Sequence, residues 1–339
     1  MIERYCLNPF RWLDITAVNE ANIQFSQCIR SWGGDDCVLG IIPLHVAAKM
    51  DVSRLWNDRQ AVQAREQTRA HGVAAWCRGC PRLAAGLEPT QPERPAKYPE
   101  HWTHINLAYD KSCNLSCISC RSARIMHRVG TPHYKLLRQF ERAVIRPLLR
   151  YAEWAYISGL GDPFGSPAYF RLLRELRPAD APGLRWHIQT NGIGFTRDAY
   201  RRIPTRRQIA SVQFSLDAAM EGTYTQLRGS EKDWRRLGDN MRFVAELRAS
   251  GAIDTWVISM VVQKCNWGEM HAFYDLGKSL GVDAVQYNCL LNQGTYCNTD
   301  YADRAVHLAD HPVHAEFAAA CDDLSSKTNP SVLLEFPRC

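Results

Sequence analysis

The chain has 339 residues, 46% of them hydrophobic and 22% charged, which is the balance of a globular protein with about two domains. Its net charge of +6 is small and its arginines are scattered, so we expect no nucleic-acid partner, which would need a concentrated basic face with stacking aromatics. Because no apolar stretch is long enough to span a bilayer and no secretion signal opens the chain, we expect no membrane partner and a cytoplasmic location.

The first hundred residues are rich in cysteine, namely Cys6, Cys28, Cys37, Cys77 and Cys80. The last two form a CxxC pair, a spacing that is common to zinc ribbons and to iron–sulfur sites. The Pro-rich stretch from Glu88 to Pro99 predicts an extended linker. We therefore place a domain boundary there, with a small N-terminal Cys-rich domain over residues 1–99 and a second domain over residues 100–339.

The second domain alternates apolar, strand-like runs with helical patterns. The runs cover residues 102–109, 154–159, 184–190, 210–216, 255–262 and 284–290. Thr131 followed by Pro132 predicts the start of a helix, and Pro147 predicts its end or a kink. This repeated β/α pattern predicts an α/β fold, a partial (β/α)6 TIM-like barrel, whose chemistry lies at the carboxyl ends of its parallel strands.

Directly after the first of these strands, Cys113, Cys117 and Cys120 form a CxxxCxxC run. Three thiolates in one short loop can bind three irons of a cubane cluster and leave the fourth iron without a protein ligand. A fourth cysteine would close the site, and none follows within the loop. A zinc knuckle and three unrelated buried thiols are the alternatives. The sequence shows no Ser/His/Asp order, Walker loop or HExxH motif that would indicate a hydrolase or a nucleotide triphosphatase.

The CxxxCxxC run resembles the cluster loop of the radical S-adenosylmethionine (radical SAM) enzymes. The resemblance implies a 4Fe-4S cluster on Cys113, Cys117 and Cys120, whose open iron is chelated by the methionyl amino and carboxylate groups of S-adenosyl-L-methionine (SAM). One electron, from an external donor such as flavodoxin or ferredoxin, then cleaves the sulfonium and releases a 5′-deoxyadenosyl radical.

Three further strand ends resemble motifs of the same family in the same order. The segment Gly159-Leu-Gly-Asp-Pro163 resembles the turn that receives the methionine amino group, and Asp162 is the expected hydrogen-bond acceptor. The ends of the next two strands resemble the family's third and fourth strands. In relatives a hydroxyl and an arginine from the region of the fourth strand contact the ribose and carboxylate of the cofactor, and Ser215 and Arg228 are the matching residues. By resemblance the cofactor-binding residues are Gly159, Gly161, Asp162, Pro163, Thr190, Asn191, Ser215, Asp217 and Arg228.

The N-terminal domain resembles the SPASM or twitch auxiliary-cluster domain of radical SAM enzymes, although in that family it usually follows the barrel. The resemblance rests on a Leu-Trp-Asn helix start within Asp51 to Asp58, an Arg-rich helix that ends near His71, and the closing CxxC pair. It implies a second, auxiliary 4Fe-4S cluster on Cys28, Cys37, Cys77 and Cys80, with Cys6 as the substitute for Cys37. A structural zinc ribbon is the alternative.

The resemblance implies a peptide or small-molecule natural-product substrate that loses hydrogen from an unactivated carbon. An auxiliary cluster near the substrate favours net oxidation or bond formation. A cysteine that returns a hydrogen atom would instead give a redox-neutral epimerase of a peptide residue, sugar or aminocyclitol. The candidate donors are Cys265, Cys289 and Cys297, which follow or end the last two predicted strands. A non-catalytic iron–sulfur or zinc scaffold is the third alternative.

Overall fold

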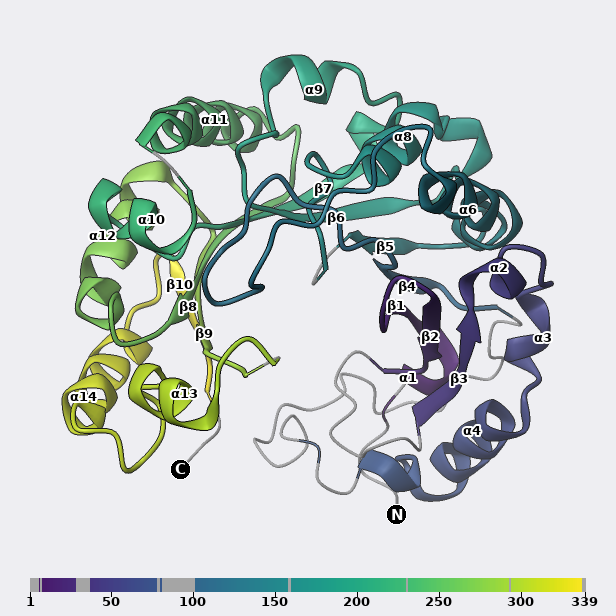
Figure 1. The fold of residues 1–339 in the computed structure, drawn as a ribbon, viewed down its shortest axis with the longest axis horizontal. Helices are drawn as coiled ribbons and strands as arrows, with labels where there is room; N and C mark the ends of the chain where they lie inside the picture. The colour runs from purple at the N-terminus through teal and green to yellow at the C-terminus, as the bar shows by residue number, and fades with distance from the viewer. Residues whose placement is uncertain are drawn as a thin grey trace. The chain divides into compact units, whose positions relative to one another are not determined.

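The computed structural model describes residues 6, 8–28, 37–77, 80, 101–157, 160–229, 231–292 and 294–336. The chain folds into two compact units, each built from several segments (Figure 1). The first comprises Met1–Lys111, His127–Gly161 and Ser166–Trp186, and the second comprises Ser112–Met126, Asp162–Gly165 and His187–Cys339. The predicted domain boundary at residue 99 lies outside the described residues and stays a prediction.

The strands of the first unit follow the order β5-β4-β1-β2-β3. Their bounds are β1 Trp12–Ala17, β2 Asn22–Ser26, β3 Val38–Pro43, β4 His104–Ala108 and β5 Trp154–Ile157. Strand β1 pairs in parallel with β4, and β1, β2 and β3 form an antiparallel meander. The N-terminal segment therefore extends the sheet that starts at β4, a pairing that the sequence did not predict.

The helices of the first unit confirm the local signals in the sequence. Thr131 caps the predicted helix by accepting a hydrogen bond from the Tyr134 amide, and Pro132 is its first residue. A π-helical turn precedes Pro147, and the helix continues past this residue to Leu149. The helical segments are α1 Asn8–Arg11, α2 Leu44–Ala47, α3 Ser53–Trp56, α4 Arg59–His71, η2 Ala75–Cys77, α6 Pro132–Phe140, η3 Glu141–Ile145, α7 Arg146–Leu149, α8 Pro167–Glu175 and η4 Pro178–Asp180.

The strands of the second unit follow the order β10-β9-β8-β7-β6. Their bounds are β6 Arg185–Thr190, whose first two residues belong to the first unit, β7 Ile209–Ser215, β8 Thr255–Val262, β9 Ala284–Cys289 and β10 Ser331–Glu335. Strand β8 pairs in parallel with β7 and with β9, and β9 pairs in parallel with β10. The first six residues of β7 are buried, as expected for a strand covered on both faces. The six predicted strands, β4 to β9, and the parallel α/β class are thus confirmed, and β10 is an additional strand.

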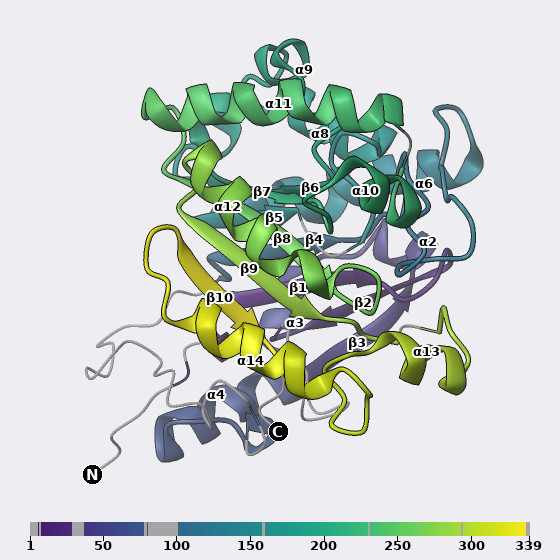
Figure 2. The same ribbon diagram turned by 90° about the vertical axis from the view of Figure 1, so that its left-hand side faces the viewer.

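Three helices of the second unit pack beside the strands that they precede. Helices α11, α12 and α14 contact β8, β9 and β10 respectively, and both ribbon views place them on the same face of these strands (Figures 1 and 2). The helical segments are α9 Arg197–Arg201, η5 Arg206–Gln208, α10 Glu221–Leu227, α11 Glu231–Ala249, η6 Trp267–Glu269, α12 Met270–Leu280, α13 Asn298–Arg304 and α14 His314–Ser325. Within the described ranges, no helix combines the length and apolarity that a membrane crossing requires.

Candidate functional site

The three-cysteine loop of the second unit is compact and closed at its base. The Cys113 amide donates to the Ile125 carbonyl at 3.0 Å, and the Cys120 amide donates to the Cys117 carbonyl at 3.0 Å. The Leu115 amide donates to the Cys113 sulfur at 3.4 Å, so the backbone turns around this thiol. Cys117 is buried, Cys113 is half-buried and Cys120 is exposed. The exposure of the cysteines therefore increases from Cys117 through Cys113 to Cys120.

Each of the three sulfurs accepts a hydrogen bond from a nitrogen-bearing side chain. The donors are Asn191 Nδ2 to Cys113 at 3.7 Å, Arg228 Nε to Cys117 at 3.3 Å and Arg121 Nε to Cys120 at 3.3 Å. Two of the donors, Arg228 and Arg121, carry a full positive charge, and charge-assisted hydrogen bonds are the stronger kind. This shell of donors fits sulfurs that act as anionic ligands.

The electrostatic environment of Cys113 disfavours a thiolate unless a positive charge lies beside it. Burial and the negative charge of Asp162 raise the pKa of the Cys113 thiol to about 11. A bare thiolate at this position is therefore unfavourable near neutral pH, and a bound metal cation would supply the missing positive charge. Three soft thiol donors suit iron–sulfur clusters and zinc rather than magnesium or calcium. The donor set thus fits a cluster.

Asp162 is buried, with 1% of its surface exposed, and its carboxylate already accepts four hydrogen bonds. One oxygen accepts from the amides of Phe164 and Gly165 at 2.9 and 2.8 Å. The other accepts from the Thr190 hydroxyl and the Asn191 amide, both at 2.7 Å. Because a carboxylate offers about four lone-pair sites, this set fills them. Asp162 therefore ties the turn at residues 162–165 to the end of β6, and an ammonium could reach it only by displacing a donor.

The turn at Asp162 also approaches the cysteine loop. The Asp162 amide donates to the Ser112 carbonyl at 2.9 Å. A Cβ atom on Gly165 would lie 2.5 Å from the Asn114 side chain, so only glycine allows this approach. Gly165 was not among the predicted site residues, although its position three residues after Asp162 is a usable signal. Gly161 has φ +68° and Pro163 follows Asp162 directly, whereas Gly159 lies outside the described residues.

At the end of β6, Asn191 joins the turn to the cysteine loop. Its side-chain amide donates to Asn114 Oδ1 at 2.8 Å as well as to the Cys113 sulfur. Its Oδ1 accepts from the Ile193 amide at 3.0 Å, which fixes the orientation of the amide. The predicted residues Thr190 and Asn191 thus lie at the cysteine loop together with Asp162.

At the end of β7, Arg228 lies between an acid and a thiol. Its Nε is 3.4 Å from Asp217 Oδ2, and its guanidinium also donates to the Ser215 carbonyl. Burial would lower the pKa of Arg228, but the charges of Asp217 and Cys117 outweigh it and raise the pKa. Asp217 has φ +61°, a left-handed conformation that the hydrogen bond from the Val261 amide at 2.8 Å supports. Arg228 is therefore held as a permanent cation against the Cys117 sulfur.

The predicted hydrogen donors lie near the ends of β8 and β9. Cys265 follows β8, and burial is the largest cause of its raised pKa. Cys289 is the last residue of β9, and exposed Cys297 caps α13 by accepting a hydrogen bond from the Asp300 amide at 3.4 Å. The residues just before Cys297 contact the cysteine loop, since Thr295 Oγ1 donates to the Cys120 carbonyl at 3.3 Å and Tyr296 Oη donates to the Ile118 carbonyl at 2.8 Å.

In the first unit, the N-terminal cysteines partly cluster. A hydrogen bond with Cys6 is the largest cause that raises the pKa of Cys77, followed by burial, and Cys28 adds to the shift. The Cys80 amide donates to the Cys77 carbonyl at 3.0 Å, which closes the CxxC turn. Cys37 is buried, and its carbonyl accepts from the Gln27 amide at 3.0 Å. The described contacts of Cys77 thus include Cys6, the residue held as the substitute for Cys37.

No protein-family model matches the sequence, and no curated protein matches it. Similar solved structures include Streptococcus suis SuiB bound to S-adenosylmethionine, with 12% identity, a TM-score of 0.49, and coverage of 84% of this chain and 56% of that chain. Another is anSMEcpe with bound AdoMet and Cp18Cys peptide, with 16% identity, a TM-score of 0.44, and coverage of 68% and 62%. The chain therefore spans less than two thirds of the length of either.

Proposed function

We propose that this chain is a radical SAM enzyme that carries a four-iron cluster on Cys113, Cys117 and Cys120. The observation that carries the proposal is the shell of Asn191, Arg228 and Arg121, which gives each of the three sulfurs a side-chain hydrogen bond. Three unrelated thiols would have no reason to share such a shell. A loop with three thiols leaves one iron of a cubane open for SAM.

The chain's own residues position this site. When bound, the cluster supplies one electron that cleaves SAM into methionine and a 5′-deoxyadenosyl radical, which takes hydrogen from an unactivated carbon. Arg228 and Asn191 hold Cys117 and Cys113 as ligands. Asp162 fixes the turn beside the loop, and we propose that the backbone of this turn, rather than the filled carboxylate, faces the methionine ammonium. Ser215, Thr190 and Gly161 remain proposed cofactor contacts.

We propose that the substrate is a peptide or small-molecule natural product, and that the reaction is a net oxidation or bond formation. The clustered N-terminal thiols support a second cluster, and Cys6 joins Cys28, Cys77 and Cys80 as a proposed ligand because it contacts Cys77. Flavodoxin or ferredoxin is the proposed electron donor.

The proposal is tested by the anaerobic formation of 5′-deoxyadenosine from SAM with a strong one-electron reductant. The reconstituted protein should form 5′-deoxyadenosine, and the Cys113→Ala/Cys117→Ala/Cys120→Ala variant should form none. The matched control is Cys321→Ala, which removes a half-buried thiol on α14. A triple variant that still cleaves SAM, or a wild-type protein that binds iron without cleaving SAM, would contradict the proposal, and the second result would favour a scaffold.

A redox-neutral epimerase is the second candidate, and the position of Cys297 favours it. This thiol follows directly after Tyr296, which holds the cysteine loop by its hydroxyl. With a substrate in deuterated water, an epimerase would install one solvent deuterium at the inverted carbon, and Cys297→Ala would abolish this transfer. An oxidative enzyme would consume one SAM per product and install no deuterium. Cys289→Ala is the parallel variant, since Cys289 ends the neighbouring strand.

A further inference from the structure

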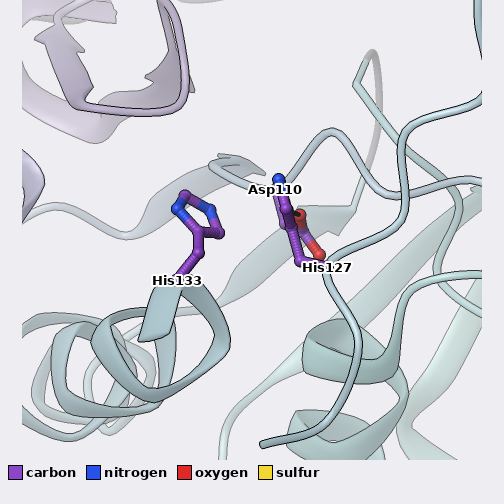
Figure 3. A group of neighbouring side chains, drawn as sticks. All are labelled: Asp110, His127 and His133. Carbon is purple, nitrogen blue, oxygen red and sulfur yellow. Dashed lines mark hydrogen bonds and ion pairs between the residues drawn. The ribbon is translucent and has the colours of Figure 1, made fainter. Parts of the chain in front are cut away.

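A second group of metal-ligating side chains lies in the first unit and contains no cysteine. Asp110, His127 and His133 each offer one ligand atom, and these atoms all lie within 4.8 Å of one another. Figure 3 shows the imidazole of His133 standing at the start of α6, beside the carboxylate of Asp110 and the ring of His127. The side chain of Asp110 is fully buried, and that of His127 is 11% exposed.

A buried carboxylate needs a positive partner or several donors, because desolvation disfavours its charge. In this structure His127 Nδ1 lies 2.7 Å from Asp110 Oδ1, and the Ser166 hydroxyl donates to the other oxygen. The Asp110 amide donates to the Tyr169 hydroxyl at 2.8 Å, which fixes the backbone beneath the carboxylate. A cation bound here would take over the role of the proton that joins Asp110 to His127.

The neighbouring charges set the balance of the site. Glu20 and Lys111 line the same small pocket as the two histidines. Glu20 Oε1 lies 3.6 Å from His127 Nε2, the ring nitrogen opposite the one that meets Asp110. The ammonium of Lys111 donates to the Val18 carbonyl at 2.8 Å. The carboxylates of Asp110 and Glu20 both lie beside His127, and negative charge at this position favours a divalent cation.

We propose that Asp110, His127 and His133 form a binding site for a divalent transition-metal ion of the zinc type. Imidazole nitrogen and carboxylate oxygen are ligands that zinc accepts, and three protein ligands with water in the fourth position are a usual zinc arrangement. Asp110 and His127 stand in the chain just before and just after the segment that carries Cys113, Cys117 and Cys120. A bound ion would therefore join the two ends of that segment.

The test uses the full chain, purified anaerobically with its clusters, and Zn²⁺ as the probe. The protein is equilibrated with Zn²⁺, desalted, and analysed for zinc and iron, and the melting temperature is recorded with and without Zn²⁺. The wild type should retain one zinc more than His133→Ala, and its affinity for Zn²⁺ should be at least about tenfold higher. Zn²⁺ should raise the melting temperature of the wild type and not that of the variant.

The control is His45→Ala, which removes an exposed histidine on α2 in the same unit and should retain zinc like the wild type. Zinc on the N-terminal thiols would be equal in all three proteins and cancels in the comparison. His127→Ala is the second variant, in case His133→Ala alters the start of α6. Equal zinc in the wild type and both histidine variants would overturn the site. Iron content reports the proposed cluster separately, so the two proposals can fail independently.

Discussion

The filled carboxylate of Asp162 leads to a prediction that separates a positioning role from direct binding of SAM. Asp162→Asn keeps the shape of the side chain but replaces one acceptor oxygen by an amide that donates. That amide must face either the amides of Phe164 and Gly165 or the pair made by the Thr190 hydroxyl and the Asn191 amide. The Thr190 hydroxyl can rotate to accept, so the second orientation costs less, but the Asn191 amide is then left without an acceptor.

The expected cost follows from this geometry. A hydrogen bond to a charged group contributes roughly 1.5–3 kcal/mol, and a buried donor left without a partner costs about 1–3 kcal/mol. With one donor orphaned and the charge lost from the remaining bonds, Asp162→Asn should lower the free energy of unfolding by about 2–4 kcal/mol. Hydrogen exchange should become faster at the amides of residues 164, 165 and 191, because opening of this turn requires less free energy.

The assay compares denaturant unfolding, amide exchange and SAM binding in the same anaerobic preparation. The control is Asp239→Asn, which removes an exposed partner of Arg242 and should change stability by less than about 1 kcal/mol. If Asp162 contacts the SAM ammonium directly, the affinity for SAM falls while stability and exchange stay at wild-type values. That outcome would refute the positioning role drawn from the four hydrogen bonds.

Three further predictions test the shell and the core. Arg228→Gln removes the cation beside the Cys117 sulfur, so the reduction potential of the cluster should fall. The fall is about 59 mV if the hydrogen bond from Arg228 strengthens by about 1.4 kcal/mol when the cluster is reduced. A redox titration followed by electron paramagnetic resonance measures the potential. Cys77→Ser/Cys80→Ser should remove about half of the bound iron, whereas lost zinc with unchanged iron would establish the ribbon. Burial lowers the pKa of His187 to about 4, so as the pH falls below about 6.5 the unfolded chain binds a proton at this residue before the folded chain does. Between pH 6.5 and 4 the wild type should therefore lose free energy of unfolding on the order of 3 kcal/mol, and His187→Asn should not. Denaturant unfolding at each pH measures this difference.

The sequence predicted those elements whose signals are local. The six apolar runs became β4 to β9 because each is short, β-rich and bounded by polar turns. Thr131 and Pro132 marked the start of α6 because a cap and a first-turn proline act within one helical turn. The Arg-rich segment became α4, which ends at His71 with Gly72 at φ +83°. In each case the residues that decide the structure are neighbours in the chain.

The strands β1, β2 and β3 escaped prediction because their stability comes from distant partners. Asp14 interrupts the apolar pattern of β1, yet it is buried and accepts hydrogen bonds from Thr16 and from Asn106 on β4. Burial raises the pKa of Asp14, and hydrogen bonds from these two side chains and from Ser26 on β2 offset part of the cost of its position. Since β1 and β4 are far apart in the sequence, no local window contains both halves of this contact.

The candidate site also combines residues that are neighbours in the chain with residues that are distant in it. The spacing of Cys113, Cys117 and Cys120 by itself indicates a metal-cluster site, because ligands on one loop are positioned by a few backbone torsions. Asn191 and Arg228 act on those sulfurs from 78 and 111 residues away, at the ends of other strands. The resemblance in the sequence placed both residues at the site and assigned both to the cofactor. In the structure each side chain donates a hydrogen bond to a cysteine sulfur. Substitutions at these positions should therefore change the reduction potential of the cluster more than the affinity for SAM.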